Sequence, residues 1–201
     1  GFFREEIVPV TLPQRKGAAV TFDTDEHPRF GTTVETLSAL RPIFREEGTV
    51  TAGNSSGIND AASCMILLSL EKARDLGVSV EAKLIGCTTA GVQPKHMGLG
   101  PVPAMQKILA QTGRPLDDFD LLEINEAFAA QMLAVDREID LPRDRLNVNG
   151  SGIALGHPVG ATGARIVVTL LHEMRRRSSR LGLASLCVSG GQGLAVAVET
   201  L

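Results

Sequence analysis

An alternation of short apolar runs and helix-period segments, separated by glycine-rich turns, occupies the chain from residue 80 onward. The predicted strands cover residues 80–87, 119–123, 183–188 and 194–199, and the predicted helices cover 101–111, 125–138 and 160–177. The last two strands flank Gly190-Gly191, which predicts a hairpin. This alternation is typical of an α/β domain in which helices cover a sheet.

Residues 1–58 lack this regularity. One short helix is predicted from Thr33, with Thr32 and Glu35 at capping-box spacing and Arg41-Pro42 as its end. The apolar run 61–69 fits either a buried strand or the start of a helix, and we favour the strand. A helix is predicted over 71–76, with Gly77 as its terminator.

Composition excludes several classes of function. The net charge is −3, and the chain has neither Tyr nor Trp, so we expect no partnership with nucleic acid or anionic membranes. The three cysteines form no CxxC pair, which predicts a reduced compartment and no metal site. We expect the cytoplasm, with mitochondrion and peroxisome left open. Cys64 and Cys87 are expected to be core residues.

Three polar sites between glycines or at strand ends are candidates for chemistry. Asn125 follows a predicted strand and is either a helix N-cap or a ligand-facing side chain. His157 lies in a Gly-His-Pro turn, where backbone can approach a ligand closely. Cys187 enters a glycine turn and is either a reactive thiol or a small core residue.

The ordered blocks NEAFAAQ, NVNGSGIALGHPVGATGAR and CVSGGQG closely resemble those of the thiolase family. Farther upstream, EIVPV, LRPIF and GTVTAGNSSGIND resemble the same family, so the resemblance covers essentially the whole chain. It implies an acyltransferase that cleaves 3-ketoacyl-CoA with CoA or condenses two acyl-CoA molecules. Coenzyme A is then a substrate, and no cofactor is expected.

The resemblance also implies roles for individual residues. His157 would activate the acyl-accepting cysteine and help to stabilise the enolate, Asn125 would hold a water for the same oxyanion, and Cys187 would move a proton at the α-carbon. The residues expected to bind substrate and CoA are Ser56, Met97, Phe128, Arg29 and Ser189. Ser189 stands where the family usually has glycine.

No block here matches the family's SMCGSG stretch with the acylated cysteine, so we expect this chain to be inactive alone. The implied fold has two α-β-α halves in five layers. Residues 1–58 would be the tail of the substrate-binding loop region, 59–80 the end of the amino-terminal half, and 81–201 the complete carboxyl-terminal half. The expected partners are acyl-CoA, an amino-terminal thiolase half and further copies in a dimer or tetramer.

Two alternatives of other classes remain open. One is a non-catalytic subunit that binds CoA or a partner chain, which the unmatched nucleophile block favours. The other is a small cysteine hydrolase using Cys187 and His157, which would need a separate residue to orient the imidazole.

Overall fold

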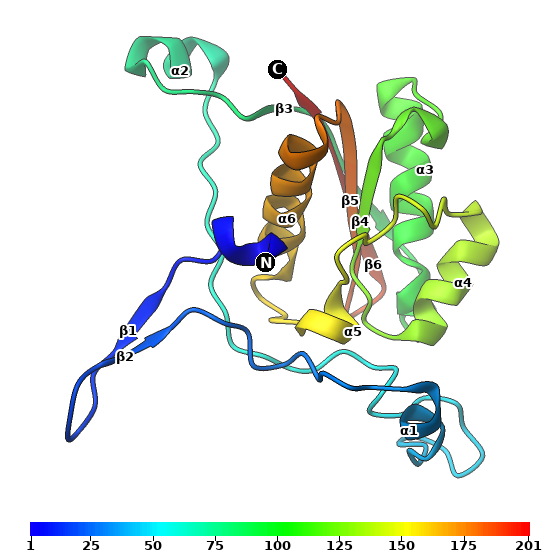
Figure 1. Ribbon diagram of the computed structural model, residues 1–201. Helices are drawn as coiled ribbons and strands as arrows, with labels where there is room; N and C mark the ends of the chain where they lie inside the picture. Colours follow the sequence, from blue (N-terminus) through cyan, green and yellow to red (C-terminus); the bar gives the residue numbers. More distant parts are fainter.

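A four-stranded sheet lies between two layers of helices in the computed structural model, which describes residues 1–201 (Figure 1). Its strands are β3 (Ala82–Gly91), β4 (Leu121–Ile124), β5 (Leu181–Val188) and β6 (Gln192–Thr200), in the order β3-β6-β5-β4. Strand β6 is antiparallel to both neighbours, whereas β4 and β5 are parallel. The predicted α/β class and the terminal hairpin are confirmed.

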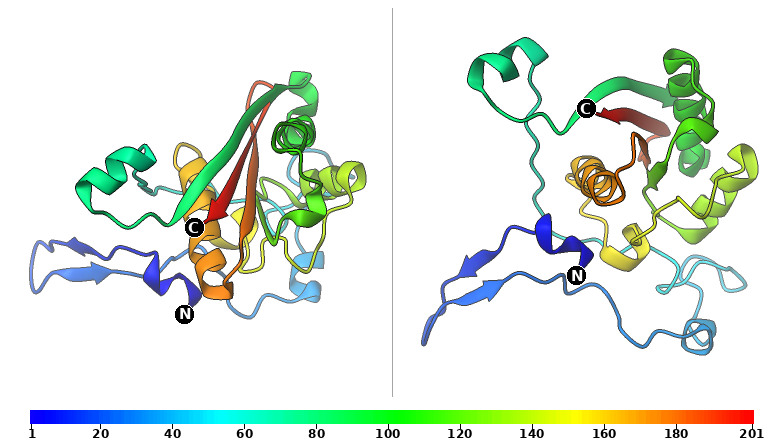
Figure 2. Two further views of the ribbon diagram at one scale, coloured as in Figure 1. Left: turned by 90° about the horizontal axis from the view of Figure 1, so that it is seen from above. Right: turned by 45° about the horizontal axis from the view of Figure 1, so that its top comes forward.

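Helices cover both faces of the sheet (Figure 2). Helix α6 (Thr162–Arg177) packs on β4 and β5, and α3 (Pro101–Thr112) packs on β3 and β6 from the other side, with α4 (Ala129–Ile139) beside it. Each face has its own apolar cluster, the larger one lying under α3 and α4. The chain therefore forms a three-layer α-β-α unit. None of its helices is both long and apolar enough to cross a bilayer.

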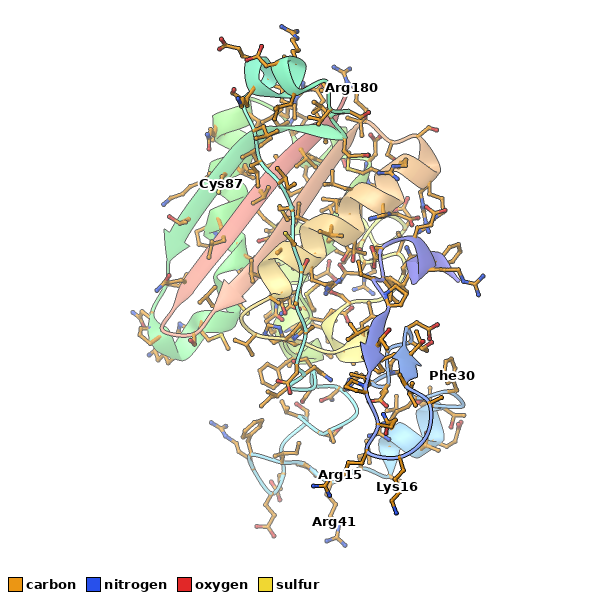
Figure 3. All side chains as sticks on the ribbon, turned by 90° about the vertical axis from the view of Figure 1, so that its left-hand side faces the viewer. Arg15, Lys16, Phe30, Arg41, Cys87 and Arg180 are labelled. Atoms are coloured by element: carbon orange, nitrogen blue, oxygen red, sulfur yellow. The ribbon has the colours of Figure 1, made fainter.

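The first 58 residues wrap around one end of this unit as an extended arm (Figure 1). The arm contains a 3-10 helix (Phe2–Glu5), a hairpin of β1 (Val10–Leu12) and β2 (Val20–Phe22), and α1 (Val34–Ser38). The hairpin was not predicted, and Figure 3 shows Arg15 and Lys16 near its tip.

The start of α1 differs by one residue from the prediction. Thr33 caps the helix, and its partner in the capping box is Thr36 rather than Glu35. Helix α1 also ends at Ser38, before the Arg41-Pro42 stop.

The strand favoured over residues 61–69 is wrong. These residues have no regular structure, because no neighbouring segment offers them a hydrogen-bonding ladder. Ile66 keeps 83% of its surface exposed despite its apolar side chain. Helix α2 (Leu70–Leu76) follows as predicted, with Ser69 as N-cap and Gly77 ending it at φ 63°.

The expectation that Cys64 and Cys87 are core residues is also wrong, because both are exposed. Cys64 lies in the segment before α2. Cys87 lies on β3, which is one of the two edge strands of the sheet (Figure 3). An edge strand has a neighbour on one side only, and α3 covers only the opposite face of β3.

Candidate active site

The end of β4 decides between the two interpretations of Asn125. Helix α4 begins only at Ala129, with Phe128 as its N-cap residue, so Asn125 does not cap it and the predicted helix start at 125 is wrong. Its backbone N–H donates to the Ser185 carbonyl on β5 at 3.0 Å, and the residue is fully buried. Asn125 therefore projects from the carboxyl end of the parallel pair β4 and β5, where α/β folds place functional side chains.

His157 lies in a loop between the short helix α5 (Gly152–Leu155) and α6. Gly156 precedes it at φ 102°, and a side chain there would collide with Asn59. The His157 N–H donates to the Gly57 carbonyl at 3.1 Å and to Asn59 Oδ1 at 3.1 Å. Gly57, at the end of the arm, and Asn59, just after it, thus fix the histidine backbone.

Both nitrogens of the His157 ring have partners. Nε2 lies 3.5 Å from Asn125 Nδ2, and Nδ1 lies 2.6 Å from Thr162 Oγ1. Because the Thr162 hydroxyl donates its single proton to the Pro158 carbonyl at 3.0 Å, it accepts from Nδ1–H. The lone pair of the neutral ring is then on Nε2, facing the Asn125 amide.

The surroundings favour this neutral form. Burial lowers the pKa of His157 below its usual value, and the positive charge of Arg165 lowers it further. Asn125 Oδ1 is buried and has no hydrogen-bond partner in the protein. This oxygen faces Gly152, where a Cβ would lie only 2.8 Å from it. The absence of a side chain at Gly152 therefore makes space for the Asn125 amide.

Cys187 lies near the carboxyl end of β5, at the same end of the parallel pair as Asn125. It follows Ser185 by two residues on β5, and the Ser185 carbonyl holds the Asn125 backbone. Its side chain is 6% exposed, and burial raises the pKa of the thiol. A lowered thiol pKa, which would suit a proton-abstracting base, is therefore not found, because desolvation outweighs the backbone hydrogen bond.

The glycine turn after Cys187 has an exposed Ser189 followed by Gly190 and Gly191 at φ 87° and 91°. Ser189 is absent from the left-handed region, so it needs none of glycine's extra freedom. Gly191 packs against the Val92 carbonyl, which leaves no room for a side chain.

Only some of the candidate substrate-binding residues lie next to one another. The Ser56 N–H donates to the Ala127 carbonyl at 3.0 Å, which places Ser56 beside Phe128, whose ring meets Phe44 edge to face. Met97 is half-buried in the 3-10 helix Pro94–Leu99, which packs against α4. Arg29 is exposed, and its carbonyl accepts a hydrogen bond from the Thr32 hydroxyl.

Two residues that hold His157 were missed by the sequence analysis, Thr162 and Asn59. The signal for Thr162 was a hydroxyl at the start of a predicted helix, five residues after a histidine. Asn59 had no such signal, because its partner is far away in the sequence. The structure has no cluster of three or more His, Cys, Asp or Glu side chains suited to a metal ion.

Comparisons with known proteins agree with this arrangement. The family model "Thiolase, C-terminal domain" matches residues 78–200, and "Thiolase, N-terminal domain" matches residues 1–71. An acetyl-CoA acetyltransferase of Pseudomonas aeruginosa is 55% identical over 98% of this chain and 50% of its own length. That of Thiocystis violacea is 53% identical over 100% of this chain and 51% of its own. The chain thus spans about half the length of the curated relatives it matches.

Solved structures show the same relationship. The acetyl-CoA acetyltransferase of Bacillus anthracis matches with a TM-score of 0.97 at 53% identity, over 100% of this chain and 51% of its own. Human mitochondrial 3-ketoacyl-CoA thiolase in complex with CoA matches with a TM-score of 0.91 at 42% identity, over 100% of this chain and 50% of its own. With the family models, this likeness in sequence and fold shows that the chain belongs to the thiolase family.

Proposed function

We propose that this chain forms the His157–Asn125–Cys187 side of a thiolase-type active site, in a protein that transfers acyl groups between CoA thioesters. The observation that carries the proposal is the approach of His157 Nε2 to Asn125 Nδ2 at the sheet edge that also bears Cys187. Similarity to acetyl-CoA acetyltransferases and 3-ketoacyl-CoA thiolases supports the reaction class.

His157 serves as the base that activates a thiol. A neutral imidazole with its lone pair on Nε2 accepts a thiol proton, and the resulting thiolate attacks the acyl carbon. Thr162 holds Nδ1–H throughout, which keeps the ring in orientation and tautomer. Once protonated at both nitrogens, the ring donates a hydrogen bond from Nε2 to developing negative charge.

Asn125 supplies polar groups that need no reorganisation. Its backbone is fixed by β5 and its side chain by Gly152 and His157. The unpartnered Oδ1 can hold a water molecule, which then donates to an enolate oxygen. Preorganised donors of this kind typically contribute about 3–4 kcal/mol to transition-state stabilisation.

Cys187 suits the role of proton donor. Its raised pKa keeps the sulfur as a thiol at neutral pH, so it has a proton for the α-carbon of the enolate released by cleavage. The thiolate left behind then takes the proton of the incoming CoA thiol. Coenzyme A enters as a substrate, and these steps use side chains alone.

Contacts beside the site support CoA binding. Ser56 and Phe128 lie next to each other through the Ser56–Ala127 hydrogen bond, and a relative binds CoA in its crystal structure. We propose that Ser56 and Met97 contact the pantetheine, that Phe128 lines the acyl pocket, and that Arg29 lies near the nucleotide. The partner for the chemistry is an amino-terminal thiolase half.

The cysteine-hydrolase alternative is weaker. It needs His157 within hydrogen-bond reach of Cys187, but the ring partners are Asn125 and Thr162. Burial also raises the pKa of the Cys187 thiol, whereas a nucleophile needs a lowered one.

The test uses the full-length protein that contains this chain. Cleavage of acetoacetyl-CoA by CoA is followed by the loss of substrate absorbance, with p-nitrophenyl acetate hydrolysis measured in parallel. His157→Gln and Asn125→Ala should lower thiolysis, whereas the matched surface variant Arg143→Met, which loses only an exposed ion pair with Asp136, should not. Tight CoA binding without thiolysis would support the non-catalytic alternative instead.

A further inference from the structure

Arg165 is an unusual residue for its place in α6. It is the fourth residue of the helix, near the amino-terminal end, where the helix dipole disfavours positive charge. Its side chain is only 18% exposed, so the charge is also largely removed from water. The helix dipole and the loss of water both disfavour the guanidinium here, so the groups that the arginine contacts must account for its position.

The guanidinium lies between β4 and the loop that leads to His157. One terminal nitrogen lies 4.0 Å from Glu123 Oε2, and the other donates to Ser151 Oγ at 3.5 Å. Ser151 in turn donates to the Ile124 carbonyl at 3.3 Å. Glu123 and Ser151 are both buried, so these contacts link the end of β4 to the start of α5.

This link lies directly behind the site. Ile124 precedes Asn125, and Gly152 follows Ser151 and packs under the Asn125 amide. A displacement of Ser151 therefore moves both the floor beneath Asn125 and the loop that carries His157. Misplacing a catalytic group by about 1 Å can lower a rate by about 100-fold.

The pair of Arg165 and Glu123 is poorly built as a stabilising ion pair. Glu123 Oε2 and one terminal nitrogen of Arg165 are buried without hydrogen bonds, and buried pairs of this kind add little stability. Acidic groups surround the guanidinium from several elements: Glu123 on β4, Glu126 after β4, Glu6 in the arm and Asp25 after β2. Arg165 lies one turn after Thr162 on α6, and the Thr162 hydroxyl holds His157 Nδ1, so the guanidinium and the imidazole lie at the same end of that helix. The positive charge of Arg165 lowers the pKa of His157 beyond the effect of burial.

We propose that Arg165 is a positioning residue for the proposed reaction, holding the Ser151 loop to the end of β4 and presenting its positive charge to His157. The inference rests on the proposed function for its effect on turnover. Its effect on the imidazole is independent of turnover.

The experiment compares Arg165→Met, Arg165→Lys and the control Arg143→Met in the full-length protein. Diethyl pyrocarbonate modifies neutral histidine, so its reaction with His157, followed by peptide mass spectrometry across pH, reports the pKa of that residue. Arg165→Met should move the midpoint to higher pH and lower kcat roughly 10- to 100-fold with little change in KM. Arg165→Lys, which retains the charge, should keep the wild-type midpoint, and the control should change neither quantity.

Two results would overturn the inference: a midpoint unchanged in Arg165→Met, or a midpoint that rises equally in Arg165→Lys. If Arg165→Met fails to fold, the double variant Glu123→Gln/Arg165→Met also removes the carboxyl group that has lost its partner, and the same shift is expected of it. An error in the proposed function would be detected separately, because His157→Gln would then retain thiolysis.

Discussion

The Nε2 atom of His157 lies 3.5 Å from the Nδ2 atom of Asn125, although the two residues belong to different loops. Asn125 directly follows β4, and His157 precedes α6, which packs on β4 and β5. Gly57, at the end of the arm, and Asn59, just after it, add a third constraint because they fix the His157 backbone. Three segments distant in the sequence therefore determine one contact.

Thr162 gives the first prediction. Replacing it by valine removes the acceptor for Nδ1–H, so the imidazole loses its fixed tautomer, and thiolysis by the full-length protein should fall about 100-fold. Thr162→Ser keeps the hydroxyl and should stay near wild type. The control is Thr112→Val, which removes a helix hydroxyl bonded to Ile108 on α3. Equal rates for Thr162→Val and Thr162→Ser would refute the orienting role.

The 201-residue chain alone should show no thiolysis. None of its segments matches the block that carries the acylated cysteine, and the two-step reaction then has no covalent intermediate. Acetoacetyl-CoA and CoA are incubated with the purified chain, and absorbance is followed. Robust turnover would show that a cysteine of this chain is acylated, and peptide mass spectrometry would identify it.

The sequence predicted the sheet side of the site better than the arm. Strand β5 is almost completely buried, and β6 and α6 each bury one apolar face in the unit itself, so their apolar patterns report their structure. Residues 61–69 have a similar apolar pattern but lie exposed, because pattern alone cannot say whether a partner strand is present. The same limit misplaced Cys87, which lies on an edge strand.

Local signals also could not place Thr162 against His157. That contact depends on the turn through Pro158 into α6, which the spacing of the residues does not specify. The asparagine at 125 was ambiguous for a related reason. An asparagine before a helical pattern usually caps it, but here α4 begins at Ala129.

The isolated chain should self-associate. Ile66, Leu67 and Leu68 are exposed side by side, at 83%, 65% and 46% of their surface. Contiguous apolar surface of this kind favours association. Light scattering after size-exclusion chromatography should give a mass above 21.3 kDa, and Ile66→Asp/Leu67→Asp should lower it. A monomer at all concentrations would argue against an uncovered apolar segment.

Glu123 predicts a pH-dependent stability. Burial raises the pKa of its carboxyl from 4.5 to about 8, and because arginine keeps its charge, Glu123 is the member of the pair that becomes neutral. Between these two pH values the folded state holds a proton that the unfolded state has lost. The contribution of Glu123 to the stability of the folded state is therefore complete below pH 4.5 and is lost as pH rises through about 8.

Glu123→Gln stays uncharged at every pH. Its free energy of unfolding, measured with urea from pH 5 to 8, should therefore fall less steeply with rising pH than that of the wild type. Glu138→Gln, on the last turn of α4, is the control for removing an acidic side chain. Parallel pH curves for Glu123→Gln and wild type would show that Glu123 is ionised in the folded protein.

Substitutions at Ser189 and Cys187 should have very different effects on thiolysis by the full-length protein. We propose that Ser189 acts through its backbone N–H, which would help to bind the thioester oxygen and which glycine retains. The Ser189 backbone lies outside the left-handed region that only glycine enters freely. Ser189→Gly should therefore change kcat less than about tenfold, since the donor itself is kept. Cys187→Ala removes the buried thiol that we propose as the proton donor, and kcat should fall by roughly 100- to 10,000-fold. Comparable losses for the two variants would show that the serine hydroxyl takes part in the reaction.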